Sequence, residues 1–211
     1  FSNNPWFEKY NPKEKGEFCL GLHPKGRFDK TIDIQSCDIQ SNTANKIINI
    51  VRDTAIKNKM IPYDIKKHTG FLRQLVIRSA DYNNETMVTL VTSKKDHEKL
   101  APIIKILSKI DEIKSIINNV NSRKADVSYS DEQYLLYGED FISEKIGKYK
   151  FKISTDSFFQ TNSKQTKKLY DIIKKEADLK GNEIVYDLYC GTGTIGIYLS
   201  GNAKKVFGFE I

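Results

Sequence analysis

The sequence predicts an α/β fold in two parts, a mixed α/β domain over residues 1–152 and the start of a Rossmann-like domain over residues 153–211. The second part is predicted by the run from Glu183 to Glu210, where an apolar strand pattern breaks into a glycine-rich turn, resumes at helical spacing and ends in a second apolar run. The first part is predicted by short β-type runs that alternate with two stretches of helical periodicity. Such an order of elements is typical of α/β proteins.

The first part divides into hairpins and helices. A turn at Pro24-Lys25-Gly26 interrupts loosely alternating residues, which favours a hairpin with a basic tip. Apolar residues at helical intervals and β-branched runs predict the other elements. In order, we expect strands within 17–34, a helix within 39–57, strands over 68–78 and 87–92, a helix over 96–107, and strands over 113–120, 133–137, 141–146 and 149–153.

A polar connection precedes the second part and leads into a helix predicted over Ser163–Ala177, with Asn162 or Ser163 as its N-cap. Two adjacent aromatic residues lie in that connection. We expect Phe159 to pack into the core, whereas Phe158 offers a flat face on which a base could stack.

The glycine-rich turn has the features of a site for a nucleotide-like cofactor. Gly191 and Gly193 permit positive φ and a close approach of the backbone to a ligand. Glu210 follows at the end of the second strand, where a carboxylate can accept hydrogen bonds from both ribose hydroxyls of an adenosine. Asp187 lies near the end of the first strand, four residues before Gly191.

Two cofactors remain open from these residues. The string Gly191-Thr-Gly193-Thr-Ile-Gly196 is formally a G-x-G-x-x-G, which would indicate a dinucleotide and an NAD-dependent oxidoreductase. Asp187 favours S-adenosylmethionine, because an acid at the strand end can help hold a positively charged group, whereas a pyrophosphate would be repelled by it. A glycine turn that binds no ligand would not explain why Asp187 and Glu210 lie at the ends of the two predicted strands.

Composition adds weak constraints. The chain has 34 Lys and Arg against 27 Asp and Glu, a formal charge of +7, which mildly favours a polyanionic partner. No apolar run is long enough for a membrane span and no signal peptide is recognisable, so we expect a cytoplasmic protein, with a monomer as the default. Cys19, Cys37 and Cys190 are widely spaced, which predicts reduced thiols.

Both ends suggest a piece of a longer protein. The chain opens on Phe1 rather than on methionine, and it closes at Ile211 directly after the second predicted strand. A Rossmann-like domain needs more strands than these, so we expect residues beyond both ends.

The strings SFFQTNSKQTKKLYD, VYDLYCGTGTIG and VFGFE resemble the RNA (uracil-5-)-methyltransferase family, the RumA/TrmA family. The strings LGLHPKGRFDKTIDIQSC, HTGFLRQLVIR and MVTLVTS are similar to its central domain in the branch that acts on 23S ribosomal RNA. The resemblance covers nearly the whole chain. It implies that residues 153–211 begin a Rossmann-like class I S-adenosylmethionine-dependent methyltransferase domain.

The resemblance also implies roles for individual residues. Phe158 would stand beside the target nucleotide, and Cys37 matches the last of four cysteines that hold a 4Fe-4S cluster in many members. Uracil C5 is a poor nucleophile, so in this family a cysteine thiolate adds to C6 before methyl transfer. That cysteine and the base are expected beyond Ile211, so the chain alone should be inactive. Contacts with S-adenosylmethionine are implied for Gln160, Tyr189, Thr194 and Glu210, in addition to Asp187, Gly191 and Gly193 of the motif.

An RNA substrate would need contacts from the central domain. Our candidates for RNA contacts there are Arg73 and Arg78, together with Lys25, Arg27, Lys66 and Lys67. The alternative from another class of protein is a non-catalytic RNA-binding module that keeps a vestigial cofactor fold. Asp187, Gly191, Gly193 and Glu210 are all present, which argues against the loss of a cofactor site.

Overall fold

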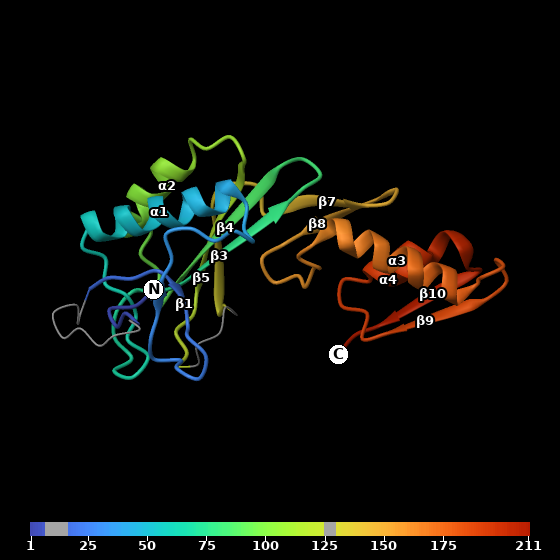
Figure 1. Ribbon diagram of the computed structural model, residues 1–211, viewed down its shortest axis with the longest axis horizontal. Coiled ribbons are helices and arrows are strands. Elements are labelled where there is room, and N and C mark those ends of the chain that lie inside the picture. Colours follow the sequence, from blue (N-terminus) through green and yellow to red (C-terminus); the bar gives the residue numbers. More distant parts are fainter. Residues whose placement is uncertain (7–16, 125–129) are drawn as a thin grey trace. The chain divides into compact units, whose positions relative to one another are not determined.

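The computed structural model describes residues 1–6, 17–124 and 130–211, and it has the mixed α/β architecture that the sequence predicts (Figure 1). The chain forms two compact units. The first comprises Phe1–Ser79 and Thr86–Asp140, and the second comprises Ala80–Glu85 and Phe141–Ile211. The turn between two strands of the first unit therefore belongs to the second unit. The assignment of 1–152 and 153–211 to functional domains stays a prediction.

The first unit is built on a four-stranded mixed sheet in the order β3-β4-β5-β6. Strands β4 and β5 are parallel, and β5 and β6 are antiparallel. The bounds of its elements are β1 (Gly21–Leu22), β2 (Ile32–Asp33), α1 (Asn42–Lys57), β3 (Leu72–Ala80), β4 (Glu85–Thr92), α2 (His97–Leu107), β5 (Ile113–Val120) and β6 (Glu132–Gly138).

The core of the first unit lies between the sheet and its two helices. Ser41 caps α1 by accepting from the Ala44 N–H, and Asp96 caps α2 by accepting from the Lys99 N–H. Apolar side chains of both helices and of three strands are fully or almost fully buried in one cluster, which includes Ile47, Val51, Leu72, Leu90, Leu100, Ile103 and Ile116. The periodicity of the two helical stretches thus reflects burial on one face.

The predicted basic hairpin forms, with shorter strands than expected. Strands β1 and β2 pair antiparallel over two residues each. The Arg27 N–H donates to the Pro24 carbonyl oxygen, and Gly26 has φ of 75°. The turn is therefore as predicted.

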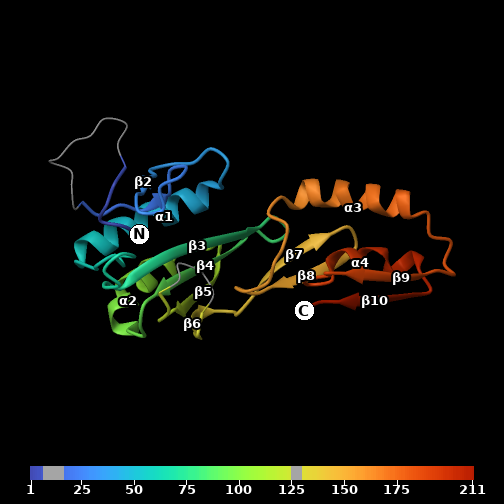
Figure 2. The same cartoon turned by 90° about the horizontal axis from the view of Figure 1, so that it is seen from below.

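The second unit contains an antiparallel hairpin, a long helix and a parallel β-α-β unit. Its elements are β7 (Ile142–Ile146), β8 (Tyr149–Ile153), α3 (Ser163–Ala177), β9 (Ile184–Leu188), α4 (Thr194–Leu199), the 3₁₀ turn η2 (Ser200–Asn202) and β10 (Lys205–Phe209). Strands β9 and β10 pair in parallel, which confirms the predicted β-α-β unit. Within this unit α3 runs along the hairpin and α4 (Figure 2).

Helix α3 begins where the sequence predicts. Asn162 is its N-cap and accepts from the Gln165 N–H at 3.0 Å. Phe159 packs against Phe151 with ring centroids 5.7 Å apart, so the expectation that it joins the core is confirmed. No helix in the described ranges is both long and apolar enough to cross a bilayer.

Candidate cofactor site

The glycine turn links the two acids of the site to main-chain N–H groups. Tyr189, Gly191 and Gly193 all have positive φ, at 59°, 54° and 71°. A Cβ on Gly191 would meet no atom within 4 Å, so the glycine is required for its backbone conformation rather than for lack of space. The Gly191 N–H donates to Glu210 Oε2 at 2.6 Å. Glu210 therefore lies against the turn, as the predicted site requires.

Asp187 holds the start of α4. Its Oδ2 accepts from the Gly196 N–H at 2.9 Å. A Cβ on Gly196 would lie 2.9 Å from that oxygen and 3.1 Å from Val206 Cγ1. The last glycine of the string is thus needed for close packing of α4 on β9 and β10, a different role from that of the first two.

The connection before α3 lies beside the same turn. The Thr192 hydroxyl donates to the Phe158 carbonyl oxygen at 3.2 Å. Phe158 is 71% exposed, and Gln160 is also exposed. Phe158, the Gly191-Thr192 turn and Glu210, from three separate stretches of the sequence, therefore meet at one place.

Tyr189 stands out by its conformation. It is a non-glycine residue in the left-handed region, and it is 79% exposed. Such a conformation costs about 1–3 kcal/mol and persists where the surrounding structure holds it. A large exposed ring held in this way beside the turn fits the contact with the cofactor that the resemblance implies.

Two tyrosine hydroxyls join α3 to α4 beside the site, and sequence reasoning missed both contacts. The Tyr170 hydroxyl of α3 lies 2.6 Å from Thr194 Oγ1 at the start of α4, with Tyr170 only 2% exposed. The Tyr198 hydroxyl donates to Asp171 Oδ1 at 2.6 Å, and this acceptor raises the pKa of Tyr198 to about 12. The helical spacing of Thr166, Tyr170 and Ile173 on α3 was the available signal, but it does not name the partners.

Cys190 packs against the second strand. A Cβ on Gly208 would lie 3.0 Å from Cys190 Sγ, so the thiol occupies the space beside this glycine of β10. Cys190 therefore acts as a small packing residue at this point.

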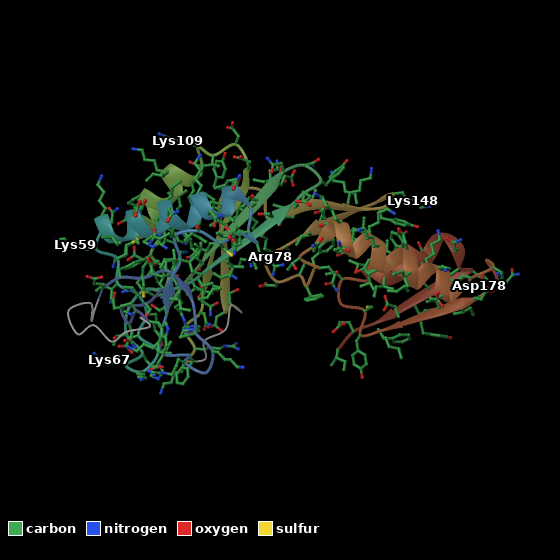
Figure 3. All side chains as sticks on the ribbon, viewed as in Figure 1. Lys59, Lys67, Arg78, Lys109, Lys148 and Asp178 are labelled. Atoms are coloured by element: carbon green, nitrogen blue, oxygen red, sulfur yellow. The ribbon has the colours of Figure 1, made fainter. Side chains whose placement is uncertain are left out.

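The predicted RNA contacts in the first unit differ in accessibility. Arg73 is 4% exposed, donates from Nη1 to the Asn121 carbonyl oxygen at 2.8 Å and lies 4.2 Å from the centroid of the Tyr63 ring. A phosphate contact by Arg73 would break these interactions, so the structure favours a packing role for it. Arg78 lies half-buried on β3 (Figure 3). Lys25 and Lys67 are exposed.

Two further candidates for RNA contacts, Arg27 and Lys66, form ion pairs with the carboxylate of Asp29. Arg27 Nε lies 2.9 Å from Asp29 Oδ1, and Lys66 Nζ lies 2.8 Å from Asp29 Oδ2. The hydrogen bonds from Arg27 and then Lys66 hold the pKa of Asp29 well below its usual value. Lys66, Lys67 and Arg73 border a cavity of about 610 Å³ in this unit, together with His23 and Phe28.

Cys37 supplies one thiolate and no more. The Asn45 side chain holds the main chain of Cys37, because it accepts from the Cys37 N–H and donates to the Cys37 carbonyl oxygen. Among the described residues no group of three or more His, Cys, Asp or Glu side chains gathers that could hold a metal ion. A 4Fe-4S cluster needs several thiolates, so these residues do not fit one by themselves. The cluster stays a prediction from the resemblance.

The chain is similar to a family of RNA-modifying enzymes. Residues 25–211 match the family model described as tRNA (uracil-5-)-methyltransferase. An uncharacterised RNA methyltransferase of Clostridium tetani is 44% identical over 200 residues, which are 94% of this chain and 43% of the relative. One of Chlorobaculum tepidum is 36% identical over 196 residues, 92% of this chain and 41% of the relative. The chain thus spans less than half the length of these relatives.

A solved structure shares the fold. The Pyrococcus abyssi tRNA (uracil-54, C5)-methyltransferase in complex with S-adenosyl-L-homocysteine superposes with a TM-score of 0.75 at 32% identity, over 90% of this chain and 46% of that one. The Rossmann-like fold class expected for the second part is confirmed by this similarity.

Proposed function

The chain belongs to the tRNA (uracil-5-)-methyltransferase family, and on that premise we propose that the whole protein transfers a methyl group from S-adenosyl-L-methionine to C5 of a uridine in RNA. The observation that carries the proposal is the meeting of Glu210, the glycine turn and the Phe158 segment at the carboxyl ends of β9 and β10. Ligands of open α/β sheets bind at such ends.

The residues around the turn would bind and orient the cofactor. Glu210 holds the Gly191 N–H with one carboxylate oxygen, and its other oxygen would accept from the ribose. Asp187 keeps α4 in place and adds negative charge near the methionine part, whose sulfur is cationic. When bound, the cofactor supplies a methyl group made electrophilic by that sulfur. Gln160, Tyr189, Gly193 and Thr194 complete the proposed contacts around the same turn.

Phe158 would serve the substrate rather than the cofactor. Its ring is exposed while its main chain is tied to Thr192, so the ring can stack on a base without loss of core packing. A uridine in folded RNA must leave its stack to reach the methyl group, and an exposed ring beside the cofactor could receive it.

The RNA class is a finer part of the proposal. The expectation from the resemblance is 23S ribosomal RNA, whereas the matched family description and the Pyrococcus protein refer to tRNA. We therefore propose a uridine in RNA and leave the two classes as arms of the test.

The test is tritium release from C5. The intact protein is incubated with S-adenosylmethionine and with tRNA or ribosomal RNA labelled with 5-³H uridine, and release is expected from one of the two. Binding is measured in parallel by calorimetry. A protein that binds NAD in preference to S-adenosylmethionine, or that binds the latter and releases no tritium from either RNA, would contradict the proposal.

Glu210→Gln gives a test at the residue level. Glutamine can still accept from the Gly191 N–H but loses the charge that strengthens bonds from the ribose hydroxyls. We expect affinity for S-adenosylmethionine to fall roughly tenfold, about 1.4 kcal/mol. Glu176→Gln, at an exposed position of α3, is the control and should bind as the wild type does. Equal affinity of the two variants would exclude Glu210 from the site.

A further inference from the structure

One surface of the second unit combines lysines with aromatic rings. Lys145 on β7 and Lys150 and Lys152 on β8 are exposed, and the rings of Tyr82 and Phe141 lie beside them. We call these five residues the lysine–aromatic face. Lys148, in the turn between the two strands, adds a fourth exposed lysine near one end of the hairpin (Figure 3).

Two lysines of this face lie opposite each other in the hairpin. Lys145 pairs directly with Lys150 in the register of the hairpin. Like charges directly opposite each other on a sheet are destabilising. In the part of the chain that the structure describes, no ion pair joins Lys145, Lys150 or Lys152 to a carboxylate. An anion bound across the pair would remove this repulsion.

The ammonium groups of the three lysines lie close to the two aromatic rings of the face. The ammonium groups of Lys145 and Lys150 lie 5.4 Å and 5.7 Å from the centroid of the Tyr82 ring. Lys152 lies 4.1 Å from the centroid of the Phe141 ring. Tyr82 is 45% exposed, so its ring can accept a base while the long lysine side chains turn to neighbouring phosphates.

A buried carboxylate fixes Tyr82 in this position. Glu144 is 2% exposed and accepts from the N–H groups of Asp81 and Tyr82 at 2.9 Å and 3.2 Å. It also accepts from the Lys145 N–H at 2.8 Å and from the Ser163 hydroxyl at 2.6 Å. Glu85 adds a bond from the Ser143 N–H at 2.7 Å. The turn that carries Tyr82 is therefore anchored to β7 through main-chain atoms, and the two nearby acids are engaged in these bonds.

We propose that the lysine–aromatic face binds a looped or single-stranded segment of the substrate RNA, with a base stacked on Tyr82 and phosphates on Lys145, Lys150 and Lys152. The inference rests on the proposed function for the identity of the polyanion. The rings select RNA over a purely electrostatic partner such as an acidic lipid surface, because a stacked base uses both the ring and the charge. It adds an RNA contact outside the cofactor site.

The lysines are tested by salt dependence. Lys145→Gln, Lys150→Gln and Lys152→Gln are combined in the intact protein, and binding to a labelled RNA hairpin with a uridine-rich loop is measured from 50 to 200 mM salt. Each lost phosphate contact on a single strand lowers the slope of log K against log salt by about 0.7, so the triple variant should lose about 2. The matched control combines Lys175→Gln, Lys180→Gln and Lys204→Gln, which remove the same charge from exposed positions of the same unit. Equal slopes for the two triple variants would overturn the inference.

The ring is tested by Tyr82→Ala and Tyr82→Phe. The anchoring bond uses the Tyr82 main chain, so neither variant removes it. Loss of stacking should weaken binding of the looped RNA roughly tenfold in the alanine variant, and phenylalanine should retain it. Binding of heparin, which has charge but no bases, should be the same for both. An alanine variant that binds the RNA as the wild type does would overturn the stacking.

The failures of the two proposals are distinguishable. If the wild type releases no C5 tritium from any RNA, the proposed function fails. If the wild type is active and both the lysine triple variant and Tyr82→Ala bind RNA as it does, the proposed function stands and this face is excluded.

Discussion

Tyr198 shows how a single hydroxyl joins the helices of the second unit. Its ring packs at 5.5 Å from that of Tyr170, and its hydroxyl donates to Asp171 on α3. Because the Asp171 carboxylate accepts a hydrogen bond from this hydroxyl and the ring is largely buried, the pKa of Tyr198 rises from 10.0 to about 12. The neutral form is therefore favoured in the folded state. The stability from this shift is present below pH 10 and is lost as the pH rises towards 12.

The substitution Tyr198→Phe tests this dependence of stability on pH. Removing a hydroxyl bonded to a carboxylate should lower the free energy of unfolding by about 1.5–3 kcal/mol at pH 8. The difference from the wild type should shrink by roughly 1 kcal/mol at pH 11, where unfolded Tyr198 is ionised and folded Tyr198 is not. Urea denaturation at the two pH values measures both numbers.

Tyr149→Phe provides a control of opposite sign. The hydrogen bond with Ser200, followed by the charge of Lys148, lowers the pKa of Tyr149, so its ionised form is favoured in the folded state. Its contribution to stability should therefore grow as the pH rises through the same range. If both variants responded to pH in the same direction, the assigned contacts would be wrong.

At the scale of elements, the β-α-β unit depends on how closely α4 approaches its strands. Gly196 is the point of contact, where its N–H bonds to Asp187 and its bare Cα faces Val206. The glycine string therefore serves both ligand approach and packing. This is why a simple reading of G-x-G-x-x-G does not identify the cofactor.

Gly196→Ala should be costly for a six-residue helix. The added Cβ would lie 2.9 Å from Asp187 Oδ2 and 3.1 Å from Val206 Cγ1, which forces α4 outwards. Overpacking of this kind costs about 1–3 kcal/mol of unfolding free energy. Affinity for S-adenosylmethionine should fall with it, because Asp187 and the turn shift together.

The matched substitution is Gly201→Ala. Its Cβ would meet only terminal atoms of Tyr149 and Lys148, at 3.1 Å and 3.3 Å, and these side-chain ends can move. Thermal unfolding and calorimetry of both variants provide the comparison. Equal losses for the two would contradict the role assigned to Gly196.

At the scale of the whole molecule, the two units have separate cores. The core of the first unit joins α1 and α2 to the sheet, whereas that of the second joins the hairpin to α3 and α4 through Ile146, Phe151, Tyr170 and Tyr198. Because each unit has its own core, local opening in one unit can be independent of the other.

Cofactor binding should therefore be visible in hydrogen exchange as a local effect. We expect saturating S-adenosylmethionine to slow exchange in β9, α4 and β10, because a ligand stabilises the part of the protein that it binds. Exchange in α1 and α2 should stay unchanged. Protection confined to the first unit, or none in the second, would contradict the site.

The sequence by itself determined the order of elements and the local chemistry. The β-α-β unit, the glycine turn and the Asn162 cap were all predictable, because period, φ preference and capping depend on residues a few positions apart. The resemblance supplied the family, which the match to residues 25–211 confirms. The residues assigned to cofactor and RNA stay predictions.

Only the tertiary structure decided which side chains meet. It buried Arg73, which the sequence offered as an RNA contact, and it paired Tyr170 with Thr194 across 24 residues. It also placed Tyr82 against Lys145 and Lys150, far along the chain. Burial and partnership depend on segments distant in sequence that meet only when the chain folds, so periodicity reveals that a face is buried but not what lies against it.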